Sequence, residues 1–237
     1  MPQLENFISK KIGRAIFDYK MIKDDDVILV GVSGGKDSLT LLYDLVKRQK
    51  SFPIRYTLKA AHIISDFTEY NKDKIENVFK ELGVEYHLVS VPIIKRLKPG
   101  KTMNCYWCSS QRRIELFELA KNLGCNKIAL GHHLDDIVET ILMNMFFNGK
   151  IAAMKPVMKY ERFDNTIIRP LAYVKEEQIR KFAVKKEFIN LVCNCVYGEN
   201  SKRLELKSFI KMLEKENKSI RENIFKSLKK IESDYLL

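Results

Sequence analysis

The sequence contains no long hydrophobic run. No apolar segment approaches the roughly 18 residues that a membrane-spanning helix needs, and the first twenty residues mix charged and apolar side chains instead of forming the apolar block of a secretion signal. Internal repeats and low-complexity segments are also absent. With 46% hydrophobic and 30% charged residues, the composition excludes a disordered tail, a fibrous repeat and a coiled coil. We expect a cytoplasmic protein with no membrane partner.

The chain has fewer acidic than basic residues. The 237 residues include 30 Asp and Glu against 42 Lys and Arg, which gives a formal net charge of +12. Such an excess favours a polyanionic partner, above all a nucleic acid. A general surplus of lysine for solubility would give the same number, so the charge alone leaves both readings open. At about 150 residues per domain, the length allows one large α/β domain with a small appendage.

Short apolar runs alternate with amphipathic segments along most of the chain. We expect strands at 27–32, 54–64, 85–91, 127–130 and 166–168, and helices at 38–49, 71–82, 111–123, 135–147 and 176–186. This alternation predicts an α/β fold, a parallel twisted sheet with helices on both faces. We expect an N-terminal helix within residues 1–22, the α/β core over 23–198, and basic helices over 199–237.

The densest motif is Ser33-Gly34-Gly35-Lys36-Asp37-Ser38, which follows an expected strand and opens an expected helix. Backbone N–H groups and the helix dipole at such a junction bind phosphate, and glycines let the backbone approach the anion closely. Lys36 and two serine hydroxyls can add donors. The motif is not a Walker A loop, because Asp37 separates Lys36 from Ser38. A tight Gly-Gly turn without a ligand is the alternative.

A second strand-to-helix junction carries Gly131-His132-His133-Leu134-Asp135-Asp136. One interpretation is that its two carboxylates are simple helix caps with no further role. In the functional interpretation, Gly131 lies beneath a nucleotide and Asp136 lies near its phosphates or Mg²⁺. Adjacent histidine side chains diverge, so we interpret both histidines as lining residues and not as zinc ligands. Both junctions fall at the carboxyl ends of strands, where α/β sheets bind ligands.

Five cysteines in a cytosolic chain indicate metal or redox chemistry, because disulfides are rare in that compartment. Cys105 and Cys108 form a CxxC motif, Cys193 and Cys195 form a CxC motif, and Cys125 stands alone as an expected buried thiol. Four thiolates suit structural zinc, three suit a [4Fe–4S] cluster with one open iron, and a CxxC motif can be a redox pair. Spacing alone does not distinguish these three interpretations. Without further context, we rank structural zinc first.

The loop sequence SGGKDS resembles that of the PP-loop ATP pyrophosphatases, which split ATP between its α and β phosphates and adenylate an acceptor. The segments 105–150 and 168–173 resemble the tRNA 2-thiocytidine synthetase family, and matching features run over about residues 27–193. The combination of SGGKDS, CxxC, GHHxDD and RPL is far more specific than any one motif. A related branch that makes 2-thiouridine shares the same core.

The resemblance implies an oxygen-sensitive [4Fe–4S] cluster on three cysteines, with one iron free to carry sulfur. Cys105 and Cys108 match two of its ligands. Cys193, which Asn194 follows, matches the third, and Cys195 competes with it because the CxC motif is compressed.

ATP and Mg²⁺ are the other implied cofactors. The resemblance assigns ATP binding to the PP-loop residues 33–38, Gly131 and Asp136, and a catalytic role to Asp37, Asp136 and Arg112. Arg112 matches a basic residue that follows the CxxC motif in the thiouridine branch, and an ordinary surface arginine is the alternative. We add His62 to the ATP-binding residues, although the family often has an acidic residue near this point.

The implied function is ATP-dependent and cluster-dependent thiolation of a tRNA base. ATP would adenylate the C2 oxygen of the base, and sulfur would then displace AMP. The implied partners are tRNA, held by the basic loop 95–101 and the C-terminal helices, and a sulfur donor, either sulfide or a cysteine desulfurase product. A homodimer is compatible with this function. Two alternatives stay open: a zinc-stabilised PP-loop ligase that adds an amine to an adenylated tRNA base, and a non-catalytic Fe–S RNA-binding regulator.

Overall fold

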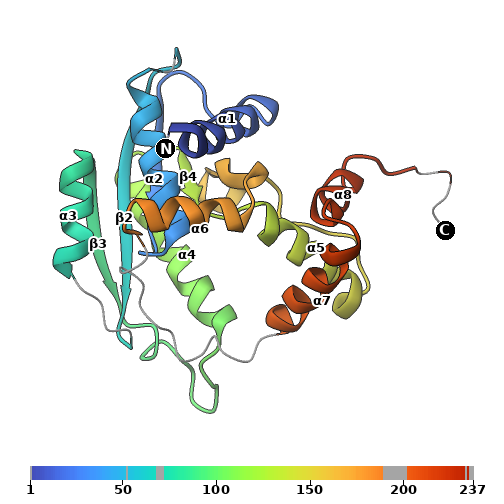
Figure 1. The fold of residues 1–237 in the computed structure, drawn as a ribbon. Helices are drawn as coiled ribbons and strands as arrows, with labels where there is room; N and C mark the ends of the chain where they lie inside the picture. The colour runs from blue at the N-terminus through green and yellow to red at the C-terminus, as the bar shows by residue number, and fades with distance from the viewer. Residues whose placement is uncertain (1, 52, 68–71, 189–201, 233, 235–237) are drawn as a thin grey trace.

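A single six-stranded sheet forms the centre of the molecule (Figure 1). The structure, a computed structural model, describes residues 2–51, 53–67, 72–188, 202–232 and 234. The strand order is β3-β2-β1-β4-β6-β5. The strands are β1 (Asp26–Gly31), β2 (Tyr56–Ser65), β3 (Glu85–Val91), β4 (Lys127–Leu130), β5 (Val157–Tyr160) and β6 (Asn165–Ile168). All pairs are parallel except β5 with β6.

The strand order creates a switch point between β1 and β4. From β1 the chain adds β2 and then β3 on one side, and it returns to place β4 on the other side of β1. Helices that follow β1 and β4 therefore leave the sheet in different directions, and a crevice opens at the carboxyl ends of these two strands. Both glycine-containing motifs lie at these ends.

Helices cover both faces of the sheet. Along β1, Ile28 and Val30 point to one face and Leu29 to the other, as the two-residue period of a strand requires. The first face packs against α1 (Pro2–Asp18), α2 (Lys36–Gln49), α3 (Lys72–Leu82) and α6 (Glu176–Lys185). The second face packs against α4 (Cys105–Asn122). The expected α/β fold is thus confirmed, with every strand fully or partly covered.

A third hydrophobic cluster joins the C-terminal helices to the core. Leu206 and Ile210 of α7 (Lys202–Glu216) and Phe225 of α8 (Ile220–Ser227) pack against α5 (Leu134–Asn148). These three helices lie at the end of the molecule opposite to α3 and β3 (Figure 1). Two short 3₁₀ helices, η1 (Glu161–Phe163) and η2 (Pro170–Tyr173), flank β6. In the described part of the chain, no helix combines the length and apolar character needed to cross a membrane.

Two details of the expected organisation are wrong. The sheet is mixed, because the unpredicted strand β5 pairs antiparallel with β6 at one edge. Helix α4 begins at Cys105 and not near residue 111, because the side chain of Asn104 caps it and accepts a hydrogen bond from the Trp107 N–H at 2.9 Å. The CxxC motif therefore lies in the first turn of a helix.

Candidate active site at the carboxyl edge of the sheet

The loop after β1 is closed by its own serine hydroxyls. The Ser33 N–H donates to Ser38 Oγ at 3.1 Å, and that hydroxyl donates to the Gly35 carbonyl at 2.9 Å. Gly34 has a φ of 84°, in the left-handed region that glycine tolerates. Gly35 is the N-cap of α2 and provides no side-chain cap. The loop therefore presents the start of a helix in the arrangement that binds phosphate.

Lys36 and Asp37 open helix α2 beside this loop. The Lys36 Nζ lies 3.1 Å from Asp37 Oδ2 and 3.1 Å from Glu176 Oε1. The other oxygen of Asp37, Oδ1, is buried and accepts no hydrogen bond within the described residues. Burial raises the pKa of Asp37, although His133 and Lys36 oppose the shift. A buried carboxylate oxygen without a donor fits a site for Mg²⁺, which prefers oxygen ligands.

Gly131 brings the end of β4 against the PP-loop. A Cβ atom at this position would lie 2.8 Å from the Ser38 nitrogen and 3.0 Å from the Asp37 carbonyl carbon. Both neighbours are backbone atoms that cannot turn aside, so the close approach requires glycine. The sequence places Gly131 and the PP-loop at the carboxyl ends of strands, and this close approach agrees with that placement.

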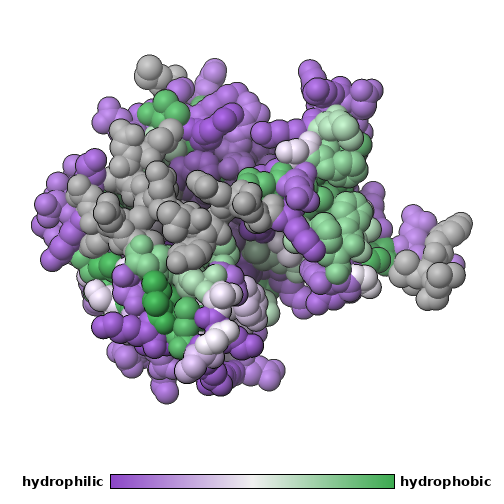
Figure 2. All heavy atoms as spheres, turned by 90° about the horizontal axis from the view of Figure 1, so that it is seen from below, coloured by the Kyte–Doolittle hydropathy of each residue, from purple (hydrophilic) through white to green (hydrophobic). Residues whose placement is uncertain are grey.

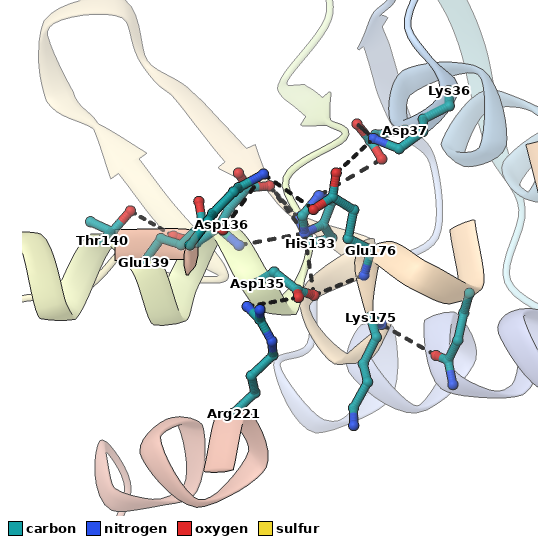
Figure 3. Close-up of polar contacts among 12 residues, drawn as sticks. Lys36, Asp37, His133, Asp135, Asp136, Glu139, Thr140, Lys175, Glu176 and Arg221 are labelled. Carbon is teal, nitrogen blue, oxygen red and sulfur yellow. Dashed lines mark hydrogen bonds and ion pairs between the residues drawn. The ribbon is translucent and has the colours of Figure 1, made fainter. Parts of the chain in front are cut away.

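His133 occupies the centre of the second junction (Figure 3). It caps α5: its N–H donates to Asp136 Oδ2 at 3.0 Å, and the Asp136 N–H donates to its Nδ1 at 3.4 Å. Its Nε2 lies 3.8 Å from Asp37 Oδ1. Asp136 therefore acts as a cap in this arrangement, and His133 links it to the PP-loop. Sequence reasoning treated His133 as a lining residue and missed this linking position.

Sequence reasoning also missed a buried carboxylate one turn after Asp136. Glu139 is 0% exposed, and its Oε2 and Oε1 lie 3.1 Å from Arg203 Nε and 3.7 Å from Lys207 Nζ. Burial raises its pKa to about 7, although the two cations oppose the shift. The three-residue spacing from Asp136 on one helix was the available signal.

Glu176 is a second missed residue. Its backbone N–H donates to Asp135 Oδ2 at 2.8 Å, and its two carboxylate oxygens contact Lys36 and Lys207. Burial works against ionisation, yet the two lysines hold the pKa of Glu176 at about 2. No motif of the sequence pointed to this residue, because α6 lies far from the PP-loop along the chain.

His62 and Arg112 lie on the other side of the PP-loop. The His62 Nδ1 donates to the Val32 carbonyl at 2.7 Å, and burial lowers the His62 pKa. Arg112 donates to Ser65 Oγ at 3.1 Å, and its Nε is buried and makes no hydrogen bond to any described residue. A cavity of about 120 Å³ adjoins Arg112 and is lined by Gly31, Val32, Ser33, Ala61, Ile63, Arg112, Leu116 and Leu130. Arg112 therefore faces the carboxyl edge of the sheet.

The RPL motif places Arg169 at the end of β6. Its side chain is almost fully buried; its Nε donates to His132 Nδ1 at 3.3 Å, and its Nη1 donates to the Lys155 carbonyl. Burial, together with Arg169, lowers the pKa of His132 to about 4, so this histidine is neutral at pH 7. The ends of three adjacent strands, β1, β4 and β6, thus all contribute polar residues to one edge.

The CxxC thiols lie at the start of α4. Cys105 is exposed, Cys108 is half-buried, and their three-residue spacing puts them on one side of the helix. Arg112 follows one turn later on the same helix. Cys193 and Cys195 fall in the segment 189–201, outside the described residues, so the assignment of the third ligand stays a prediction. Cys125 is 4% exposed, as expected.

Among the described residues, no three His, Cys, Asp or Glu side chains are arranged to hold a metal ion. The donor set of a three-cysteine cluster is nevertheless consistent with the chain. Thiolate sulfur is the ligand that iron–sulfur clusters use, and the two described thiols are paired on one helical turn. The third thiol would have to come from segment 189–201.

A family model and individual relatives identify the same family for this chain. Residues 4–192 match the family model of the PP-loop domain. A tRNA-cytidine(32) 2-sulfurtransferase of Geobacter sulfurreducens is 40% identical over 236 residues, which cover 97% of this chain and 91% of the relative. An enzyme of the same name from Ralstonia pickettii is 40% identical over 238 residues. The matched region covers 99% of this chain and 76% of the relative.

Solved structures agree with these sequences. The U34-tRNA thiolase NcsA from Methanococcus maripaludis, solved with its [4Fe–4S] cluster, has a TM-score of 0.77 at 25% identity. That match covers 96% of this chain and 78% of the thiolase. An NH3-dependent NAD synthetase from Campylobacter jejuni has a TM-score of 0.52 at 14% identity. The match covers 97% of this chain and 89% of the synthetase, and at this identity it shows a shared fold alone.

Proposed function

The chain belongs to the PP-loop family, in its tRNA-cytidine(32) 2-sulfurtransferase branch, and on this premise we propose that it replaces the C2 oxygen of cytidine 32 in tRNA with sulfur at the expense of ATP. One observation carries the proposal. A single edge of the sheet joins the PP-loop, whose Asp37 Oδ1 accepts no hydrogen bond from the described residues, to the helix that bears Arg112 and the CxxC thiols. Activation and sulfur transfer need these two halves side by side.

The first half of the reaction activates the base. Lys36 and the N–H groups at the start of α2 hold the phosphates, and Asp37 would hold Mg²⁺, which would neutralise phosphate charge. The C2 oxygen of cytosine attacks the α-phosphorus, a new O–P bond forms, and the bond to the β-phosphate breaks as pyrophosphate leaves. The base then carries AMP, a far better leaving group than the original oxygen. His133 links Asp37 and Asp136 at the site, with carboxylate oxygens of the two residues 3.8 and 3.4 Å from its ring nitrogens.

The second half replaces the activated oxygen with sulfur. Cys105, Cys108 and Cys193 would hold the [4Fe–4S] cluster, with Cys195 as the competing third ligand, and the bound cluster would carry the sulfur atom that the sulfur donor supplies. Arg112 has an Nε–H that no described residue accepts, so it can donate to the AMP group as it departs. The C2–O bond breaks, a C2–S bond forms, and AMP leaves with the original oxygen.

The substrate surface lies on the C-terminal helices. A cleft of about 580 Å³ between α6, α7 and α8 is lined by six cationic and four acidic side chains: Lys175, Arg180, Lys207, Lys211, Lys218, Arg221, Asp135, Glu176, Glu177 and Glu214. We place the tRNA backbone along this cleft, because neutralisation of phosphates by Lys and Arg dominates affinity for nucleic acids. The sulfur donor is sulfide or a cysteine desulfurase product, and a tRNA substrate places the enzyme in the cytoplasm.

A homodimer is the assembly we propose. Large apolar side chains of α5 and α7 are exposed: Met145, Phe146, Phe147, Leu204, Phe209 and Met212. Figure 2 shows hydrophobic atoms gathered on the lobe that contains these helices. Exposed apolar side chains on two neighbouring helices fit contact with a second copy of the chain better than solvent. Sedimentation analysis of wild-type protein and of Phe146→Ser tests it: a monomer in both cases contradicts the dimer.

The proposed function is tested with anaerobically purified protein. We expect brown protein with about four iron atoms per chain that converts ATP to AMP and pyrophosphate only when tRNA is present, with one thiolated base per ATP. Stoichiometric zinc without acid-labile sulfide would favour the amine-adding ligase instead. Tight tRNA binding without any ATP turnover would favour the RNA-binding regulator.

A further inference from the structure

One carboxylate lies between two lysines from opposite ends of the chain. Glu176 Oε1 is 3.1 Å from Nζ of Lys36, the lysine of the PP-loop, and Glu176 Oε2 is 3.2 Å from Nζ of Lys207 on α7. The backbone N–H of Glu176 is fixed by Asp135 (Figure 3). The distance between the two lysines is thus spanned by a single three-atom carboxylate group.

This arrangement is the one that a phosphate group adopts between two ammonium groups. A phosphoryl group also offers several oxygens to donors on different sides, and it carries more charge than a carboxylate. Lys36 belongs to the loop that receives phosphates, so the acid that it contacts here must give way when a nucleotide enters. Lys207 is held at the other end of the same acid, and it would then face the same phosphates.

The charge balance around the two lysines supports such an exchange. Three cations, Lys36, Arg203 and Lys207, form ion pairs with four acids, Asp37, Asp136, Glu139 and Glu176. These acids repel a nucleoside triphosphate as long as they stay between the cations. Release of the Glu176 carboxylate removes one acidic partner from each lysine at once, and the Glu176 side chain, 33% exposed, borders the open cleft.

We propose that Lys207 is a phosphate-binding residue of the nucleotide site, contributed by the C-terminal helix α7, and that Glu176 takes the place of a phosphate group until the nucleotide arrives. The inference rests on the proposed function for the identity of the nucleotide, ATP with Mg²⁺. On binding, phosphate oxygens replace the carboxylate on Lys36 and Lys207, and Glu176 turns into the cleft.

Helix α7 stays docked during the exchange. Leu206 and Ile210 remain buried against α5, and Arg203 and Lys207 keep their contacts with Glu139 at 3.1 and 3.7 Å. Glu139 therefore positions Lys207 after Glu176 has left it. The C-terminal helices close the nucleotide site in this arrangement, in addition to any contact with tRNA.

The test measures nucleotide affinity without tRNA, by calorimetric titration of Mg²⁺ and α,β-methylene-ATP into the full chain. We expect Lys207→Gln to weaken binding about tenfold, which corresponds to about 1.4 kcal/mol. Glu176→Gln should instead tighten binding several-fold, because the neutral amide no longer competes with phosphate. Lys215→Gln is the matched control: Lys215 is exposed on the same helix, has no ion pair with any described residue, and should leave the affinity unchanged.

The tighter binding of Glu176→Gln separates this role from a structural one, since a residue that only orients Lys36 would weaken binding when it is neutralised. Weaker binding by Glu176→Gln, or equal affinities for Lys207→Gln and Lys215→Gln, would overturn the inference. Either result with a wild-type protein that thiolates tRNA would leave the proposed function intact. A wild-type protein that binds no nucleotide would refute both.

Discussion

At the scale of single residues, the site is marked by carboxylate oxygens that lack hydrogen-bond donors. Asp37 Oδ1 is buried with no hydrogen-bond partner in the described structure. We therefore expect Asp37→Asn to lower ATP-dependent thiolation by on the order of 100-fold, because the neutral amide holds Mg²⁺ less strongly than a carboxylate does, while the iron content is unchanged. Anaerobic thiolation assays and iron counts on the same preparation measure both. Full activity in this variant would reduce Asp37 to a helix cap.

Glu139 makes stability depend on pH. Burial raises its folded-state pKa to about 7 from an ordinary value of 4.5. Because the folded-state value is the higher one, the stability that Glu139 contributes is complete below pH 4.5 and is lost as the pH rises to about 7. Glu139→Gln stays neutral throughout, so its free energy of unfolding should exceed that of the wild type by on the order of 1–2 kcal/mol near pH 8.

Urea unfolding near pH 8 and near pH 4.5 measures this difference for Glu139. The advantage of Glu139→Gln should disappear at the lower pH, where both side chains are neutral. Glu118→Gln, at an exposed position of α4, is the control and should show no pH-dependent difference. An equal difference at both pH values would mean that the Glu139 pKa is not raised.

At the scale of elements, the site depends on how closely β4 approaches α2. Gly131→Ala would place a Cβ atom 2.8 Å from the Ser38 nitrogen. We expect this overpacking to cost about 1–3 kcal/mol of stability and to weaken nucleotide binding, because it displaces the PP-loop. Thermal unfolding and nucleotide titration measure the two effects. Unchanged affinity would show that the loop shifts without consequence for the phosphates.

The segment after α6 decides the third cluster ligand. Cys193 and Cys195 are only two residues apart, so either thiol is a candidate for the same cluster position. We expect Cys193→Ser to lose iron and activity together and Cys195→Ser to keep a cluster and most activity, as anaerobic reconstitution can show. The reverse result would move the ligand to Cys195. Loss of the cluster in both variants would indicate four cysteine ligands and no open iron.

Most elements could be predicted from hydrophobic periodicity, and the exceptions have physical reasons. Strand β5 has only four residues, and at its centre Met158 and Lys159 are exposed, so neither a buried run nor an alternation marks it. The first turn of α4 contains Cys, Tyr, Trp and Ser without an amphipathic period, and its start depends on the side chain of Asn104. A cap of this kind is a local hydrogen bond that periodicity does not reveal.

At the scale of the whole molecule, the strand-end motifs could be placed together from sequence, and the contacts of α7 could not. Parallel strands bring their carboxyl ends to one edge, so the PP-loop and Gly131 were expected to meet. The apolar stripe of α7 predicted a helix but did not identify α5 as its partner. Glu139, Glu176 and Lys207 come together through that tertiary packing, and so no motif pointed to the three as a group.

The central claim is that this chain exchanges oxygen for sulfur on a tRNA cytidine. The most direct measurement is mass spectrometry of nucleosides and of the fragment containing position 32, from tRNA incubated anaerobically with the protein, Mg²⁺, ATP and sulfide. We predict 2-thiocytidine at position 32 with wild-type protein, and none with Asp37→Asn or Cys105→Ser. Consumption of ATP with unmodified cytidine, or with an amine adduct at the base, would contradict the account.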